Sequence, residues 1–178
     1  MAKRIVAVFT PPHYKNSDGV PVLWLGRINR AIRIANQQQC PVIIAGDANG
    51  GKDLERFFLH AKRNKVRAVV QAFNGNDPAF KNTRGDAKAI ARVIGEIPAL
   101  RRAREIVIVS CWYHIPRCWI ALRQELGDHH ARISCSPVWS KIWHGIKALP
   151  NEIRGCVDYL RRRPQVSRGE PIGKPDFE

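Results

Sequence analysis

The chain has 178 residues, 44% of them hydrophobic, and its 30 Lys and Arg against 15 Asp and Glu give a formal net charge of +15. This is the length of one ordinary domain, with enough apolar content for a core, so a scaffold that depends on disulfide or metal staples is excluded. The charge has two explanations at this point: a solvated basic face that maintains solubility, or a surface that binds nucleic acid or another anionic partner.

The cysteine pattern and the short apolar runs indicate where the chain resides. Its five cysteines are odd in number, scattered and free of CxxC pairs, which favours a reduced, cytoplasmic compartment. The first apolar run, residues 5–10, is too short for a signal-peptide core or a membrane span, and no later run is longer. We therefore expect neither export nor membrane contact. One domain is predicted over residues 1–163, followed by a mobile tail over residues 164–178 that is rich in Pro, Gly and charge.

Apolar periodicity predicts strands and helices in alternation along the chain. The first strand covers residues 3–10, and a helix follows with Trp24, Ile28, Ala31, Ile32 and Ala35 on one side. Further strands are predicted at residues 41–45, 68–73, 105–111 and 131–138. Helices are predicted after the glycine-rich loop 46–51, at residues 82–94 and at residues 114–126.

The last part of the chain shows two apolar patterns. The first predicts a segment packed on the body of the domain and contains Trp139, Trp143, Ile146 and Leu149. The second predicts a final amphipathic helix and contains Ile153, Val157 and Leu160.

The alternation predicts a Rossmann-like, doubly wound α/β fold: a mostly parallel, five-stranded sheet with helices on both faces. Binding sites in such sheets lie beyond the carboxyl ends of the strands. Polar residues just after the predicted strands are therefore the candidates for function.

The first polar cluster is the loop after the second predicted strand, with Gly46, Asp47, Asn49, Gly50 and Gly51. Glycines permit the turns that aim successive N–H groups at one point before a helix, which suits a phosphate. The same pattern also serves as an ordinary strand-to-helix connection. Asp47 opposes an anion unless it holds a metal, acts as a base or caps the helix.

The second polar cluster contains Asn82, Thr83 and Asp86, which precede an apolar helical run. Thr-x-x-Asp at this position is close to a capping box, so capping alone explains it. The same residues also lie at the expected strand-end surface, where they can contact a ligand.

The third polar cluster contains Ser110, Tyr113, His114 and Arg117 within one strand-to-helix turn. His114 and Arg117 are three residues apart and therefore share one face of the first helical turn. There the imidazole can transfer a proton and the guanidinium can clamp a phosphate or carboxylate. The alternative is a structural junction in which His114 is a cap and Arg117 is a surface ion-pair partner.

Two remaining features concern a metal and the first helix. Cys111, His114 and Cys118 have no fourth ligand nearby, so no metal site is predicted. Arg27 borders the buried stripe of the first helix, which would place its guanidinium partly covered near the edge of the sheet.

Taken in order, these motifs resemble the YdcF/SanA/ElyC-like family of α/β domains, over residues 4–138. The resemblance rests on the following residues: Arg27 with Ala31, Gly46 with Gly50, Gly51 and Glu55, Asn82 with Thr83, and Val109 and Ser110 with Tyr113, His114 and Arg117. It implies a Rossmann-like fold whose polar residues converge on one pocket. Some members are linked to cell-envelope biogenesis and another to nucleotide-like ligands. The sequence departs from the family where Asp47 replaces a glycine and where Gly85 and Asp86 replace Glu-Asn.

The function expected from these observations is an enzyme, a hydrolase or group transferase, acting on a phosphorylated or otherwise anionic small molecule such as a nucleotide. His114 would be general acid or base, and Asp47 or Asp86 would orient water or a metal. Arg27 and Arg117 would neutralise the anion. The sequence does not identify a cofactor. The alternative is a non-catalytic protein that binds nucleic acid through its basic surface.

Overall fold

The computed structural model describes residues 3–9, 22–46, 51–73, 83–139 and 142–161. Its strands form one five-stranded, fully parallel sheet in the order β3-β2-β1-β4-β5. The strands are β1 (Arg4–Phe9), β2 (Val42–Gly46), β3 (Val69–Phe73), β4 (Glu105–Cys111) and β5 (Arg132–Val138). The strand order reverses between β1 and β4, so the switch point of the fold lies at the carboxyl ends of these two neighbours.

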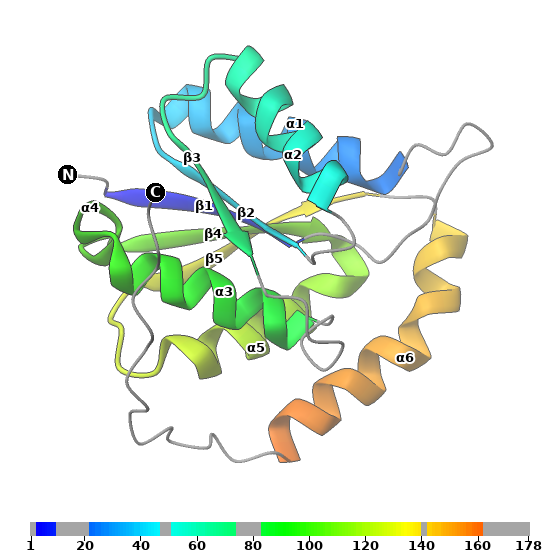
Figure 1. The fold of residues 1–178 in the computed structure, drawn as a ribbon. Coiled ribbons are helices and arrows are strands. Elements are labelled where there is room, and N and C mark those ends of the chain that lie inside the picture. The colour runs from blue at the N-terminus through cyan, green and yellow to red at the C-terminus, as the bar shows by residue number, and fades with distance from the viewer. Residues whose placement is uncertain (1–2, 10–21, 47–50, 74–82, 140–141, 162–178) are drawn as a thin grey trace.

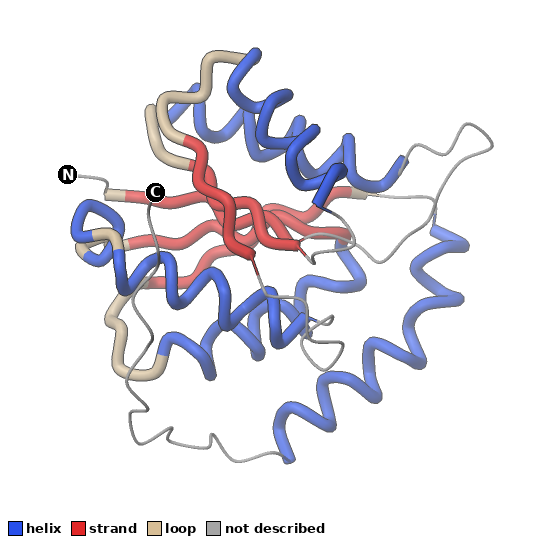
Figure 2. The backbone as a smooth tube through the Cα atoms, viewed as in Figure 1, coloured by secondary structure: helices blue, strands red, loops and turns tan. Residues whose placement is uncertain are grey.

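Helices cover both faces of the sheet, which confirms the predicted doubly wound α/β class (Figures 1 and 2). Helices α1 and α2 lie on one face, and α3 and α5 lie on the other (Figure 1). The helical elements are α1 (Val22–Gln38), α2 (Gly51–Arg63), α3 (Thr83–Glu96), α4 (Pro98–Arg101), the 3-10 helix η3 (Trp112–His114), α5 (Ile115–Leu126) and α6 (Ile142–Arg161). None of these helices is both long and apolar enough to cross a membrane.

The central strand shows how the sequence produces two cores. Ile5, Ala7 and Phe9 of β1 belong to the core beneath α3 and α5, whereas Val6 and Val8 belong to the core beneath α1 and α2. Successive strand side chains point to opposite faces, so a strand that is apolar at every position is buried on both.

Helix α6 differs from the prediction for this part of the chain. It is one continuous helix, and the large aliphatic side chains described on it face outward: Ile146 and Ile153, for example, are 49% and 57% exposed. Trp139, just before the helix, is 75% exposed. The inward face carries Gly145, against which the indole of Trp112 packs, and the buried Glu152. Ile146 and Leu149 therefore do not pack on the body as predicted. Trp139 does contact it, because its ring stacks on that of Trp112 with centroids 5.9 Å apart, and the side chain of Trp143 lies outside the described residues.

Candidate functional site at the carboxyl edge

Arg27 lies at the switch point of the sheet and is only 2% exposed. Its guanidinium donates to the backbone oxygen of Phe9 at the end of β1 and, over 3.4 Å from Nε, to the Sγ of Cys111 at the end of β4. A guanidinium is expensive to bury, so a buried one at the strand ends is a candidate for contact with an anionic ligand.

His114 connects a hydroxyl with a carboxylate in the same region. Its Nε2 lies 3.4 Å from Oγ1 of Thr83, the first residue of α3. Its Nδ1 lies 2.8 Å from Oε2 of Glu152 on α6. Three separate elements thus meet at one imidazole, and all three side chains are buried.

The hydrogen-bond partners determine the tautomer of His114. A carboxylate only accepts hydrogen bonds, so the short contact with Glu152 requires the proton on Nδ1. The lone pair is then on Nε2, which accepts from the Thr83 hydroxyl. This order of hydroxyl, imidazole and orienting carboxylate is the arrangement by which nucleophiles are activated.

Burial keeps His114 neutral. Loss of solvation lowers the pKa of this imidazole to about 4, the hydrogen bond with Glu152 opposes the shift, and the charge of Arg27 adds to it. A neutral imidazole whose Nε2 is unprotonated is the form that can accept a proton.

Arg117 neutralises the carboxylate that orients His114. Its Nε lies 3.0 Å from Glu152 Oε2 in an ion pair, but the N–H is not directed at that oxygen as in a hydrogen bond. Its terminal nitrogen lies 3.3 Å from His114 Nδ1, and because both atoms carry protons in this tautomer the contact is not a hydrogen bond. The expected closeness of His114 and Arg117 on one helical face is therefore found. The charge of Arg117, however, is directed to Glu152 within the protein.

The remaining described candidates surround this group. Ser110 is fully buried on β4, and its Oγ accepts from Cys118 Sγ over 3.7 Å. Burial, and then Cys111, raise the pKa of Tyr113 to about 12. Asp86 is buried on α3, close enough to Cys118 to act on its thiol electrostatically.

The glycine loop contributes only its ends to the described structure. Gly46 is the last residue of β2 and Gly51 is the first residue of α2. The predicted site residues Asp47, Asn49, Gly50 and Asn82 lie outside the described residues. Segments 10–21, 47–50 and 74–82, which follow the carboxyl ends of β1, β2 and β3, lie outside them as well.

Glu152 is the residue that sequence reasoning missed. It follows His114 by 38 positions and does not belong to any of the polar clusters that follow the predicted strands. One signal was present: the helical spacing of Gly145, Glu152 and Tyr159, seven residues apart, marks a second face of α6. Tyr159 also contacts the Thr83 hydroxyl.

The described residues contain no group of three or more His, Cys, Asp or Glu side chains arranged to hold a metal ion. Comparisons with protein-family models, with curated proteins and with solved structures give no match to this chain. Function must therefore be inferred from the geometry of the site itself.

Proposed function

We propose that the protein is a hydrolase or group transferase that acts on a phosphorylated or otherwise anionic small molecule at the carboxyl edge of the sheet. The observation that carries the proposal is the chain from Thr83 through neutral His114 to Glu152. Such a chain supplies a positioned base in a site from which water is largely removed.

The roles follow from the contacts. His114 Nε2 removes a proton from the Thr83 hydroxyl, or from a water or substrate hydroxyl that takes its place, and Glu152 stabilises the imidazolium that forms. The separation of 3.4 Å between Oγ1 and Nε2 is loose, as catalytic hydrogen bonds commonly are before substrate binds. Arg27 stabilises the substrate's negative charge at the switch point.

The buried cation favours an anionic substrate over a neutral one. A neutral ligand would gain little from a guanidinium held at the ends of β1 and β4, whereas a phosphate or carboxylate compensates for the cost of burying it. A nucleotide or sugar phosphate has the required charge.

Native mass spectrometry of the purified protein tests the proposal. The expected result is a bound small molecule that carries phosphate or carboxylate and is released on denaturation. The same molecule, added back, should raise the melting temperature of the wild type and have much less effect on Arg27→Lys, which keeps the charge but loses the planar fork.

Turnover is then measured with the released molecule or, if none is found, with a general phosphoester such as p-nitrophenyl phosphate. His114→Gln should lower kcat by at least about a hundredfold while the protein remains folded. The proposal is wrong if turnover is unchanged in folded His114→Gln. It is also wrong if the protein binds none of the four candidate ligands: the released molecule, inorganic phosphate, ADP and the phosphoester.

A further inference from the structure

The amino edge of the sheet, opposite the proposed catalytic site, collects basic residues from distant parts of the sequence. Helix α2 ends in the basic run 62–67 just before β3, and α4 leads through the run 101–104 into β4. Parallel strands all begin at the same edge, so the fold brings these two runs together. The amino ends of β1 and β5 add Lys3, Arg4 and Arg132.

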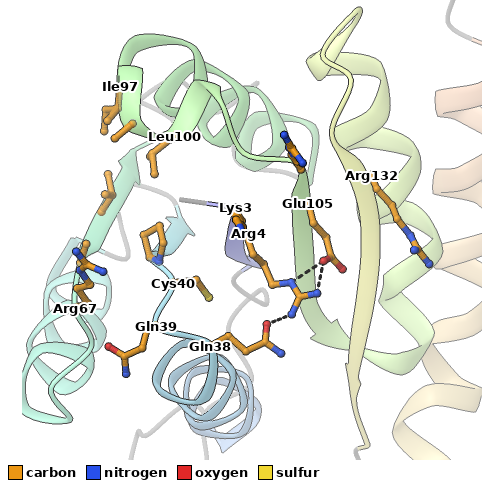
Figure 3. Close-up of a pocket in the computed structure, with 15 residues that line it drawn as sticks. Lys3, Arg4, Gln38, Gln39, Cys40, Arg67, Ile97, Leu100, Glu105 and Arg132 are labelled. Carbon is orange, nitrogen blue, oxygen red and sulfur yellow. Dashed lines mark hydrogen bonds and ion pairs between the residues drawn. The ribbon is translucent and has the colours of Figure 1, made fainter. Parts of the chain in front are cut away.

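A cleft of about 840 Å³ lies between these basic segments. Its lining is largely apolar, with Pro41, Val70 and Leu100 among others, and the described residues add five basic side chains: Lys3, Arg4, Arg67, Arg104 and Arg132. Glu105 is the one acidic residue among the described residues of the lining. Figure 3 shows Arg67 and Leu100 on one side of the cleft and the Arg4–Glu105 pair on the other, with Arg132 turned away from that pair.

Most of the positive charge in the cleft is not compensated. The carboxylate of Glu105 accepts a hydrogen bond from the Ser134 hydroxyl and is also bound by Arg4. The Ser134 hydrogen bond, then Arg4 and Arg132, hold the pKa of Glu105 below its usual range against the opposing effect of burial. Lys3, Arg67 and Arg104 are exposed, and within the part of the chain that the structure describes none of them has a carboxylate partner.

We propose that this amino-edge cleft binds the sugar-phosphate backbone of a nucleic acid strand. The cations are exposed and distributed along the edge of the sheet, instead of being buried around one point as in a site for a small anion. A polymer that presents an anion at every residue matches that distribution and gains affinity from counterion release at each contact.

The lining also indicates whether the cleft can distinguish one base sequence from another. Among the described residues no aromatic side chain lines the cleft, so these residues offer bases no stacking platform. Contacts to phosphate position a strand without carrying sequence information. Binding at the cleft is therefore strongly salt-dependent and nearly independent of sequence.

Fluorescence anisotropy with labelled RNA single strands and DNA duplexes of unrelated sequence tests the proposal. The wild type should bind at about 50 mM salt and lose affinity steeply toward about 200 mM. The combined substitution Lys3→Gln, Arg67→Gln and Arg104→Gln should weaken binding at least about tenfold and make the slope of log K against log salt less negative by about 2 to 3.

The matched control removes the same charge elsewhere. Lys147→Gln, Arg154→Gln and Arg161→Gln lie on exposed positions of α6 and should change affinity less than about threefold, because they act only through screened, long-range attraction. If the combined cleft variant fails to fold, Arg67→Gln alone should still reduce affinity about threefold with an unchanged melting temperature.

Three results would overturn the proposal: no binding of any strand by the wild type, equal losses in the cleft and α6 variants, or saturation by inorganic phosphate or ADP at the cleft with no affinity for strands. The His114→Gln variant should bind strands as the wild type does. Failure of the cleft proposal is thereby separated from failure of the proposed catalytic function.

Discussion

The neutral state of His114 has a measurable consequence for stability. Its pKa is about 4 in the folded protein, chiefly because of burial, against an ordinary value of 6.5. Below pH 6.5 His114 binds a proton in the unfolded chain but not in the folded protein. The contribution of neutral His114 to the free energy of unfolding, which is present above this pH, is therefore lost as the pH falls toward 4. Between pH 7 and pH 5 the loss from this residue is roughly 2 kcal/mol.

Urea unfolding of the wild type and of His114→Gln across this pH range measures the effect. The amide does not titrate, so the difference in unfolding free energy between the two proteins should shrink or reverse as the medium becomes acidic. Parallel pH profiles, or an NMR titration of His114 near pH 6.5, would contradict the burial argument.

Glu152 is expected to be a structural as well as a positioning residue. In Glu152→Gln the carboxylate that pairs with Arg117 and accepts from His114 is gone, which leaves a poorly solvated guanidinium uncompensated. We expect a loss of about 2 kcal/mol in unfolding free energy and a fall in any turnover that depends on His114.

The control is Glu125→Gln, which breaks the part-buried ion pair with Arg84, whose side chains are 33% (Arg84) and 18% (Glu125) exposed. Solvent screens this pair more than it screens the contacts of Glu152, so the expected loss is about 1 kcal/mol or less. Thermal or urea unfolding of both variants gives the comparison, and equal losses would mean that the Glu152 contacts contribute no more than this more exposed ion pair.

At the level of elements, α6 reaches the site only because two of its glycines permit close approach. A Cβ on Gly145 would lie 2.2 Å from an indole carbon of Trp112, and one on Gly155 would lie 2.6 Å from Cδ of Arg117. Both contacts are far inside van der Waals distance, so a side chain at either position displaces the helix or its neighbour.

Gly145→Ala should therefore destabilise the protein by about 1–3 kcal/mol, even though alanine favours a helix by about 1 kcal/mol over glycine. Gly95→Ala in α3 is the matched control, because nothing lies within 4 Å of its added Cβ. It should raise stability by up to about 1 kcal/mol. Melting temperatures that move in the same direction for both variants would refute the close packing of α6.

The sequence predicted some elements better than others for a physical reason. Strand β4 was predicted with its observed limits, Glu105–Cys111, because a strand buried on both faces is an uninterrupted apolar run. For α6 the same reasoning failed, since its apolar stripe faces outward and its packing face carries glycine and Glu152. The sequence places Thr83, His114 and Arg117 near one another because they follow the ends of strands. It gave no reason to expect that Glu152 on α6 would join them.

At the level of the whole molecule, the net charge of +15 opposes the compact state through repulsion between like charges. At 0.1 M, salt screens the repulsion between exposed charges that lie more than about 10 Å apart. Added sodium chloride should therefore stabilise the protein by about 1 kcal/mol, or roughly 2–4 °C in melting temperature.

Sodium chloride is the appropriate salt for this measurement because sulfate also strengthens apolar burial. Differential scanning calorimetry at low and moderate salt gives the result. A melting temperature that falls with salt would mean that ion pairs such as Arg4–Glu105 outweigh the repulsion.

The position of the amino-edge cleft could not be read from the sequence. Basic runs at residues 62–67 and 101–104 are visible in the chain, but only the strand order shows that both precede strands of one parallel sheet. Charge counting alone left a solvated face and a binding surface equally open.

All strands of a parallel sheet run in the same direction, so the candidate site at their carboxyl ends and the cleft at their amino ends should respond to mutation independently. A strand of six residues such as β1 keeps them about 20 Å apart, well beyond the distance at which substitutions usually interact. Joining the cleft substitutions with His114→Gln should thus change unfolding free energy by the sum of the separate changes, within about 0.5 kcal/mol. A coupling free energy near zero means that selection can alter the chemistry at one edge without disturbing recognition at the other.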